Sequence, residues 1–158
     1  MYCPENSGVV SVLLGNGDGT FQTAVPYDTG GASPVSVAIA DVNGDGKPDI
    51  IVASSRGGID ILLGNGDGTF QTAVSYDSGV SPATVAVSDV NNDGKLDILA
   101  ANEPYSSIAA MLGNGDGTFQ NAVLYAVGYS PQSVAVADVN SDGNPDVVVA
   151  NDCAWPLA

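Results

Sequence analysis

The sequence predicts an all-β fold made of β-propeller blades, each a sheet of four antiparallel strands. Three observations lead to this prediction. The stretch LLGNGDGTFQTAV begins at Leu13 and again at Leu62, and MLGNGDGTFQNAV begins at Met111, so the chain repeats every 49 residues. Each repeat holds four short apolar stretches bounded by Gly, Asn, Asp and Pro, and no segment shows helical periodicity of useful length. A repeat of this length with four strands is typical of a propeller blade.

The four strands can be followed through one repeat. The first is expected at 36–42 (SVAIADV) and the second at 49–54 (DIIVAS), on either side of an aspartate-rich loop. The third is expected at 59–63 (IDILL) and the fourth at 69–76 (TFQTAVSY), on either side of GNGDG. Asn-Gly and Asp-Gly between apolar stretches favour tight hairpin turns, because Gly and Asn accept positive φ angles.

Applied to the whole chain, this pattern predicts one repeat domain over residues 1–158 with three blade equivalents. Its parts are a half blade at 9–28, blades at 36–77 and 84–126, and a half blade at 133–152. The terminal blade is thus split between the N- and C-terminal parts of the sequence. Propellers usually have about four to eight blades, so we expect closure between chains. The partner is then a second copy, either in a closed six-bladed dimer or in a head-to-tail filament.

The composition excludes several classes of function. Eighteen acidic residues stand against three basic ones, and the net charge of −15 disfavours nucleic acid and anionic membranes. No apolar stretch approaches the roughly 20 residues that span a bilayer, so membrane insertion is not expected. Histidine is absent, which removes the commonest general base. We therefore expect a protein that is not an enzyme.

Three aspartate-rich loops carry the clearest chemical signal. They are DVNGDGKPD at 41–49, DVNNDGKLD at 89–97 and DVNSDGNPD at 138–146, called here the first, second and third loops. In each, side-chain oxygens fall at positions 1, 3, 5 and 9, glycine stands at position 6, and position 7 can offer its carbonyl, which is the pattern of a calcium loop. The sequence predicts three Ca²⁺ sites per chain. Their ligands are expected at Asp41, Asn43, Asp45, Lys47 and Asp49; at Asp89, Asn91, Asp93, Lys95 and Asp97; and at Asp138, Asn140, Asp142, Asn144 and Asp146.

Two alternatives to calcium exist for these loops. Asp, Asn and Gly also favour ordinary turns without metal, but three carboxylates within nine residues would repel one another without a cation. Magnesium fits less well because it demands octahedral geometry and keeps its waters. Position 12 holds Val52, Ala100 and Val149 instead of glutamate, so we expect β-hairpin calcium sites and not EF-hands, with the position-9 aspartates as bidentate ligands.

The GNGDGTF segments are a second metal candidate, with one aspartate in each: Asp18, Asp67 and Asp116. The simpler interpretation is a hairpin turn whose phenylalanine packs between blades (Phe21, Phe70 and Phe119). The repeated tyrosines are expected to pack on strand faces, or to form a sugar platform with Trp155 (Tyr27, Tyr76 and Tyr125). Cys3 and Cys153 are expected to form a disulfide, within a chain or between neighbouring subunits.

VAVADVNSDGNPDVVVAN and SVLLGNGDGTFQ resemble the FG-GAP and VCBS repeats, the calcium-binding blades of integrin α-subunit propellers and of many large bacterial surface or secreted proteins. The resemblance implies that the three loops bind calcium between the first two strands of a blade. The function that we expect is a non-catalytic, calcium-stabilised extracellular scaffold for adhesion or self-assembly, because the chain lacks histidine and extracellular calcium suits weak sites of this kind. The family includes adhesion modules, fungal lectins and propellers attached to enzymes, so the alternative is a lectin-type propeller that binds carbohydrate, with a protein or glycan as ligand.

Overall fold

A computed structural model describes residues 8–56, 58–79 and 81–153. Its regular structure is β-strand throughout, apart from the single 3₁₀ turn η1 (Glu103–Tyr105), which confirms the predicted all-β class. Two sheets have four antiparallel strands, and two further sheets have two strands each. The strands are β1 (Val9–Val12) and β2 (Val25–Asp28); β3 (Pro34–Ala40), β4 (Asp49–Ser54), β5 (Gly58–Leu62) and β6 (Val74–Tyr76); β7 (Thr84–Ser88), β8 (Asp97–Asn102), β9 (Ser107–Met111) and β10 (Val123–Ala126); and β11 (Tyr129–Ala137) and β12 (Asp146–Cys153).

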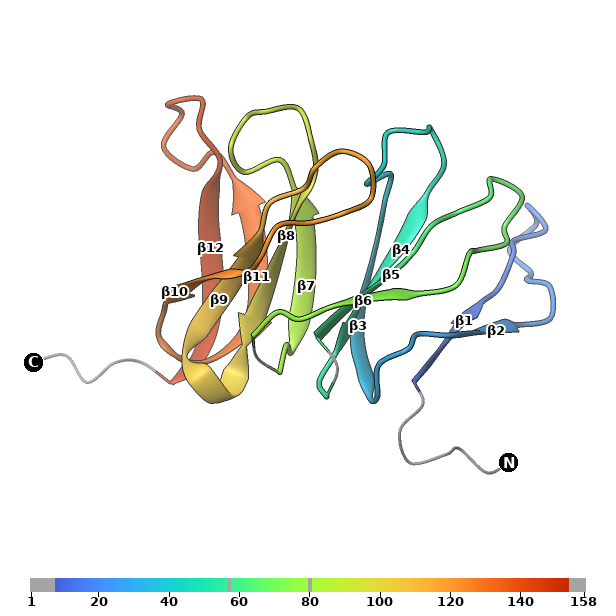
Figure 1. The fold of residues 1–158 in the computed structure, drawn as a ribbon, viewed down its shortest axis with the longest axis horizontal. Coiled ribbons are helices and arrows are strands. Elements are labelled where there is room, and N and C mark those ends of the chain that lie inside the picture. The colour runs from blue at the N-terminus through green and yellow to red at the C-terminus, as the bar shows by residue number, and fades with distance from the viewer. Residues whose placement is uncertain (1–7, 57, 80, 154–158) are drawn as a thin grey trace, which may run out of the picture.

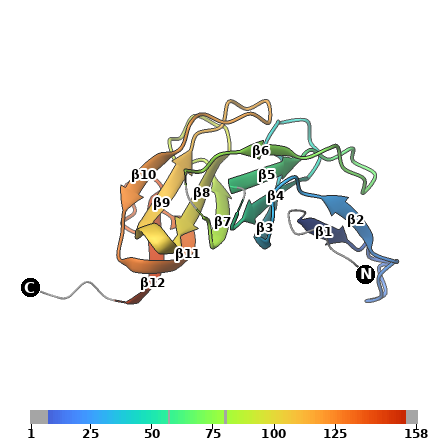
Figure 2. The ribbon, with the colours of Figure 1, turned by 60° about the horizontal axis from the view of Figure 1, so that its bottom comes forward.

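The four sheets follow one another along an arc, with β1–β2 at one end and β11–β12 at the other (Figures 1 and 2). The first strands of the last three sheets lie side by side, because β3 contacts β7 and β7 contacts β11. Within the described ranges, no helix is long and apolar enough to cross a membrane.

Three apolar clusters fill the spaces between neighbouring sheets. The largest lies between β3–β6 and β7–β10 and includes Ile51, Ile61 and Met111. The others lie on the outer faces of these two sheets, against β1–β2 and against β11–β12. Because each four-stranded sheet is covered on both faces, every residue of β4 and β8 is buried. Burial on both faces explains why these strands read as continuous apolar stretches and do not alternate.

The fourth strand of each four-stranded sheet is shorter than the sequence predicts. A strand was expected at 69–76, but β6 covers only Val74–Tyr76. The preceding residues belong to a long turn that begins after β5, in which the Asn65 amide donates to the Thr69 carbonyl (2.9 Å) and the Gln71 amide donates to the Leu63 carbonyl (2.8 Å). These hydrogen bonds extend the turn and leave only its far end to pair as a strand.

The two four-stranded sheets differ at one buried polar position. Asp60 on β5 is buried and accepts hydrogen bonds from the hydroxyls of Ser54 (2.6 Å) and Ser75. Burial raises the pKa of Asp60, and these hydroxyls only partly offset that effect. In the next sheet Ala109 takes the corresponding place, and the side chains of Asn102 and Ser107 have no hydrogen-bond partner among the described residues.

Asp60→Asn is expected to raise the melting temperature at pH 7. Since the pKa of Asp60 is higher in the folded chain than in the unfolded chain, the ionised carboxylate opposes folding at neutral pH, and this cost disappears as pH falls through the folded-state pKa. The stability gain of the variant should therefore shrink toward zero near about pH 4. Thermal melts of both proteins between pH 7 and pH 4 measure this difference, and a gain that does not depend on pH would contradict the assignment.

Candidate metal-binding loops

The three aspartate-rich loops connect β3 to β4, β7 to β8 and β11 to β12, and all lie at the same end of the sheets (top of Figure 1). The first loop wraps around the carboxylate at its position 1. Oδ1 of Asp41 accepts the amides of Gly44 (2.8 Å) and Asp45 (3.1 Å), and Oδ2 accepts the amide of Gly46 (2.7 Å). One side chain thus fixes the curl of the backbone.

The other two loops repeat this hydrogen bonding. Asp89 accepts the amides at positions 5 and 6 of the second loop at 3.2 and 2.8 Å. Asp138 accepts the amides at positions 4, 5 and 6 of the third loop at 2.6, 3.2 and 2.8 Å. The bond from Gly143, together with the other amides, holds the pKa of Asp138 below its ordinary value.

Positions 3 and 5 continue the same frame. In the first loop, Asn43 Oδ1 accepts the Asp45 amide (3.0 Å) and Asp45 Oδ1 accepts the Lys47 amide (3.0 Å). The Lys47 ammonium lies 3.3 Å from Asp45 Oδ2. Partial desolvation raises the pKa of Asp45, but the Lys47 amide and ammonium outweigh it and leave that pKa below its ordinary value. In the third loop the amide of Asn144 lowers the pKa of Asp142.

The backbone turns sharply at two positions of each loop. Position 6 has φ of 80°, 82° and 88° at Gly46, Gly94 and Gly143, which agrees with the requirement for glycine there. Position 4 is also left-handed, and it is occupied by Gly44 (φ 73°), Asn92 (59°) and Ser141 (64°). Sequence reasoning missed this second turn, although Gly and Asn, the residues that tolerate such angles best, occupy it in two loops.

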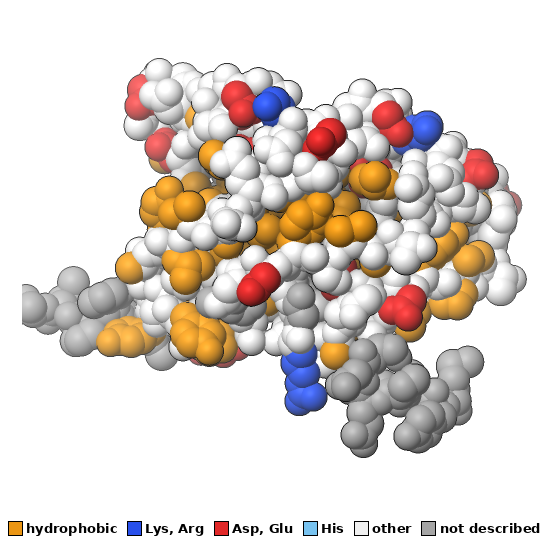
Figure 3. All heavy atoms as spheres, in the orientation of Figure 1, with side chains coloured by type: hydrophobic (Ala, Val, Ile, Leu, Met, Phe, Trp, Pro, Cys, Tyr) orange, Lys and Arg blue, Asp and Glu red, His pale blue; other side chains and the backbone are white. Residues whose placement is uncertain are grey.

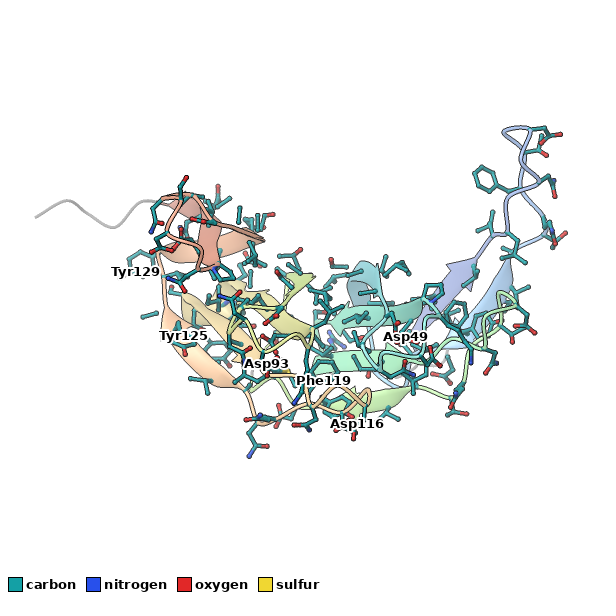
Figure 4. The ribbon with its side chains drawn as sticks, turned by 90° about the horizontal axis from the view of Figure 1, so that it is seen from above. Asp49, Asp93, Asp116, Phe119, Tyr125 and Tyr129 are labelled. Carbon is teal, nitrogen blue, oxygen red and sulfur yellow. The ribbon has the colours of Figure 1, made fainter. Side chains whose placement is uncertain are left out.

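The aspartate at position 9 has a role that the sequence did not indicate. Asp49 (Figure 4) is fully buried: Oδ2 accepts the Val42 amide (2.9 Å), and Oδ1 accepts the amide of Gly64 beyond β5 (2.8 Å). Asp97 accepts the Val90 and Gly113 amides in the same way, at 2.9 and 2.8 Å. These carboxylates join the loop to the turn after the third strand. The expectation that they are bidentate ligands stays a prediction.

The third loop lacks this second connection. Asp146 Oδ2 accepts the Val139 amide (3.0 Å), but neither oxygen has a further hydrogen bond among the described residues. In the other sheets the third strand leads to Gly64 or Gly113, whereas no third strand pairs with β12 among the described residues. Asp146 is therefore partly exposed, whereas Asp49 and Asp97 are buried.

The donor set of each loop fits a hard cation. Carboxylate and amide oxygens that accept one or two hydrogen bonds keep lone pairs for a metal, and calcium takes six to eight oxygens from carboxylates, amides and carbonyls. In the part of the chain that the structure describes, no three Asp, Glu, Cys or His side chains meet closely enough to hold a metal on their own. A cation at a loop would therefore need the mixed set, with the position-3 asparagine and the position-7 carbonyl among its ligands.

The GNGDG turns at 15–19, 64–68 and 113–117 close on themselves. Asp18 Oδ1 accepts both the amide (2.9 Å) and the hydroxyl (2.6 Å) of Thr20, and Asn16 donates to that hydroxyl (2.8 Å). Asp67 and Asp116 do the same with Thr69 and Thr118. The threonine hydroxyl lowers the pKa of all three aspartates. These contacts favour the interpretation as hairpin turns over a second set of metal sites.

Four of the six repeated aromatic residues pack between sheets, whereas Phe21, which was expected to do so, is exposed. Tyr27 and Phe70 meet edge to face with ring centroids 5.4 Å apart, and Tyr76 and Phe119 do so at 5.6 Å. Tyr125 (Figure 4) holds the same place in the third repeat and is exposed. Cys3, Trp155 and the side chain of Cys153 lie outside the described residues, so the predicted disulfide and the contribution of Trp155 to a sugar platform stay predictions.

Comparison with known proteins is consistent with the repeat. The family model for the FG-GAP-like repeat matches three overlapping stretches, at residues 1–52, 41–100 and 89–149. The first match ends just after the first loop. The second match begins at the first loop and ends just after the second, and the third match begins at the second loop and ends just after the third. The chain has no match among curated proteins.

Proposed function

The chain belongs to the FG-GAP-like repeat family, and we propose that it is a non-catalytic, calcium-stabilised propeller-like scaffold that works outside the cell. The observation that carries the proposal is the repetition of one hydrogen-bond frame in three loops of different sequence. In each, the position-1 aspartate gathers the amides of positions 5 and 6, as Asp41, Asp89 and Asp138 do.

Such a frame supports calcium binding for an electrostatic reason. It brings the carboxylates of positions 1 and 5 into one tight turn, and their mutual repulsion opposes the folded loop until a cation offsets it. A cation that binds the folded loop and not the unfolded chain stabilises the fold by mass action, by about 2.7 kcal/mol per site at a hundredfold excess over Kd. Extracellular modules typically use weak calcium sites of this kind.

Several features support a scaffold over an enzyme. The chain has no histidine and only three basic residues, and the buried carboxylates Asp49 and Asp97 are held by backbone amides. Repeats of this family are typical of extracellular proteins. The sugar-binding alternative has less support, because Tyr27 and Tyr76 pack against phenylalanines and do not present a free platform.

Calcium is expected to raise the melting temperature of the chain, and an excess of EDTA is expected to lower it. Titration calorimetry should give three calcium ions per chain, because the loops share one frame. Magnesium at the same concentration should have a smaller effect, since it keeps its waters. An unchanged melt in EDTA would overturn the proposal.

A pair of matched variants tests whether the loops hold the ion. Replacing the position-5 aspartates with asparagine (Asp45→Asn, Asp93→Asn and Asp142→Asn together) keeps an oxygen that can accept the position-7 amide but removes a charge from each loop. We expect it to abolish most of the calcium response. The control removes the same number of charges from the GNGDG turns (Asp18→Asn, Asp67→Asn and Asp116→Asn) and should keep that response. Equal loss in both variants would show a nonspecific effect of net charge.

A further inference from the structure

The sheets at the two ends of the arc each have a strand edge without a partner among the described residues. In the four-stranded sheets, the second strand lies between the first and the third, as β4 lies between β3 and β5. By contrast, within residues 8–56, 58–79 and 81–153, β12 pairs only with β11, and β1 pairs only with β2. Each edge leaves a row of backbone donors and acceptors open to another strand.

We propose that β12 of one copy pairs with β1 of a second copy, so that β11, β12 and the second copy's β1 and β2 form one four-stranded sheet. The register follows from the complete sheets, in which Ile50 lies opposite Leu62 and Ile98 lies opposite Met111. The same register places Val147 opposite Leu13 of the second copy. The inference deepens the proposed scaffold function by naming its partner and the surface that holds it.

The aromatic pairs identify the second copy as the occupant. In each repeat but the last, the repeated tyrosine packs against the phenylalanine that follows the GNGDG turn of the next sheet, as in Tyr27–Phe70 and Tyr76–Phe119. The series leaves Tyr125 without its phenylalanine at one end of the arc, and Phe21 without its tyrosine at the other. Tyr125 is 55% exposed and Phe21 is 64% exposed. The pairing of β12 with β1 of the second copy, called here the joint, brings these two side chains together.

A pocket lies where the phenylalanine and its turn would dock. Its volume is about 490 Å³, and its lining includes Leu112, Val123, Tyr125 and Val147. The face with β9 and β10 carries a band of hydrophobic side chains (Figure 3). Elsewhere the counterparts of Leu112 face a glycine: the side chains of Leu14 and Leu63 lie against Gly68 and Gly117 of the following turn. The matching glycine for Leu112 is Gly19 of the second copy.

Exposed valines on β3 and β12 show the same complementarity. Val37 on β3 is 58% exposed, whereas its counterpart Val85 on β7 is only 8% exposed, because β3–β6 covers Val85. On the other side of the joint, Val148 is 51% exposed, whereas its counterpart Leu99 is buried against Val134. When β11–β12 of one copy covers β3 of the second copy, Val148 of the first meets Val37 of the second.

The proposed pairing also supplies the hydrogen bond that Asp146 lacks among the described residues. Asp49 and Asp97 accept the amides of Gly64 and Gly113, and the repeat makes Gly15 of the second copy the corresponding donor to Asp146. A Cβ on Gly64 or Gly113 would lie 2.1 Å from the carbonyl oxygen of Pro48 or Leu96, whereas a Cβ on Gly15 meets nothing within 4 Å. A single copy gives Gly15 no steric reason to be glycine, but the joint does.

The mass of the chain in solution tests the proposal. We expect sedimentation or light scattering in calcium, reductant and about 0.15 M salt, where charge repulsion is screened beyond about 8 Å, to give a dimer or a larger species. A discrete dimer indicates a closed ring and a concentration-dependent series indicates a filament, and both contain the joint. A mass of 15.8 kDa at every concentration would overturn it and would assign the two edges to other segments or proteins.

Variants locate the joint. Gly15→Ala is expected to give a single copy with an unchanged circular dichroism spectrum, because the added Cβ is free in one copy and blocked in the joint. Phe21→Ser should also give single copies, whereas Tyr105→Ser on η1 should assemble normally, although both residues are 64% exposed. Assembly that survives both Gly15→Ala and Phe21→Ser would contradict the proposal. Gly15→Ala should keep its calcium response, so a failed joint and a failed calcium site can be told apart.

Discussion

Asp97→Ala is expected to lower the free energy of unfolding by about 2 to 6 kcal/mol, because each buried amide left without a partner costs about 1 to 3 kcal/mol. The two amides are those of Val90 and Gly113, which donate to Asp97 at 2.9 and 2.8 Å. Since a domain of this kind is stable by only about 5 to 15 kcal/mol, the substitution could remove much of that stability. Denaturant unfolding in EDTA measures the effect apart from any contribution of calcium.

The control for this substitution is Asp146→Ala in the third loop. Asp146 has the same sequence context but accepts only the Val139 amide and is partly exposed. Its loss should cost no more than about 1.5 kcal/mol, the usual range for one hydrogen bond. Both substitutions are best compared in the Gly15→Ala background, which keeps Asp146 out of the proposed joint. Equal effects of the two would show that burial and the second amide do not matter.

Phe119→Ala is expected to destabilise the chain by about 3 to 5 kcal/mol, the usual cost of removing a buried phenylalanine from a core. Phe119 is buried in the largest apolar cluster and packs edge to face with Tyr76, with ring centroids 5.6 Å apart. Its removal leaves a cavity between β3–β6 and β7–β10. Denaturant unfolding curves of the variant and the parent chain give the difference.

The matched control is Phe21→Ala, in the corresponding GNGDG turn of the first repeat. Its side chain is exposed in a single copy, so its loss there should change stability by no more than about 0.5 kcal/mol. The same substitution should weaken assembly. A large loss of stability at low protein concentration would contradict the assignment of Phe21 to a surface that is free in one copy.

Much of the fold could be predicted because the same sequence pattern occurs three times in the chain. The repeat of 49 residues and the turn glycines predicted the antiparallel four-stranded sheets, and the sharp turn expected at position 6 of the loops is present at Gly46 and Gly94. Local chemistry decides these features, so a local pattern is enough to find them. The packing of Phe70 and Phe119 between sheets was also predicted and is confirmed.

The features that were missed depend on partners distant in sequence. Asp49 was interpreted only as a ligand, because nothing near it in the chain reveals that Gly64 donates to it from beyond β5. The shortened β6 results from hydrogen bonds across the long turn between β5 and β6, such as that from the Gln71 amide to the Leu63 carbonyl. Asp60 and Ala109 occupy matching places, yet only the folded sheet shows that one is a buried acid with two serine partners.

The two ends of the arc offer unlike surfaces: the β12 edge with Tyr125, and the β1 edge with Phe21. A contact between unlike surfaces gives an assembly polarity, because each added copy must present the same end to the one before it. If two copies close into a ring, the second joint forms within one complex at high effective concentration, so half-joined pairs should be scarce. If they do not close, every filament keeps one free β12 edge and one free β1 edge. A copy in which one of these edges is blocked would then stop growth at only one end of the filament.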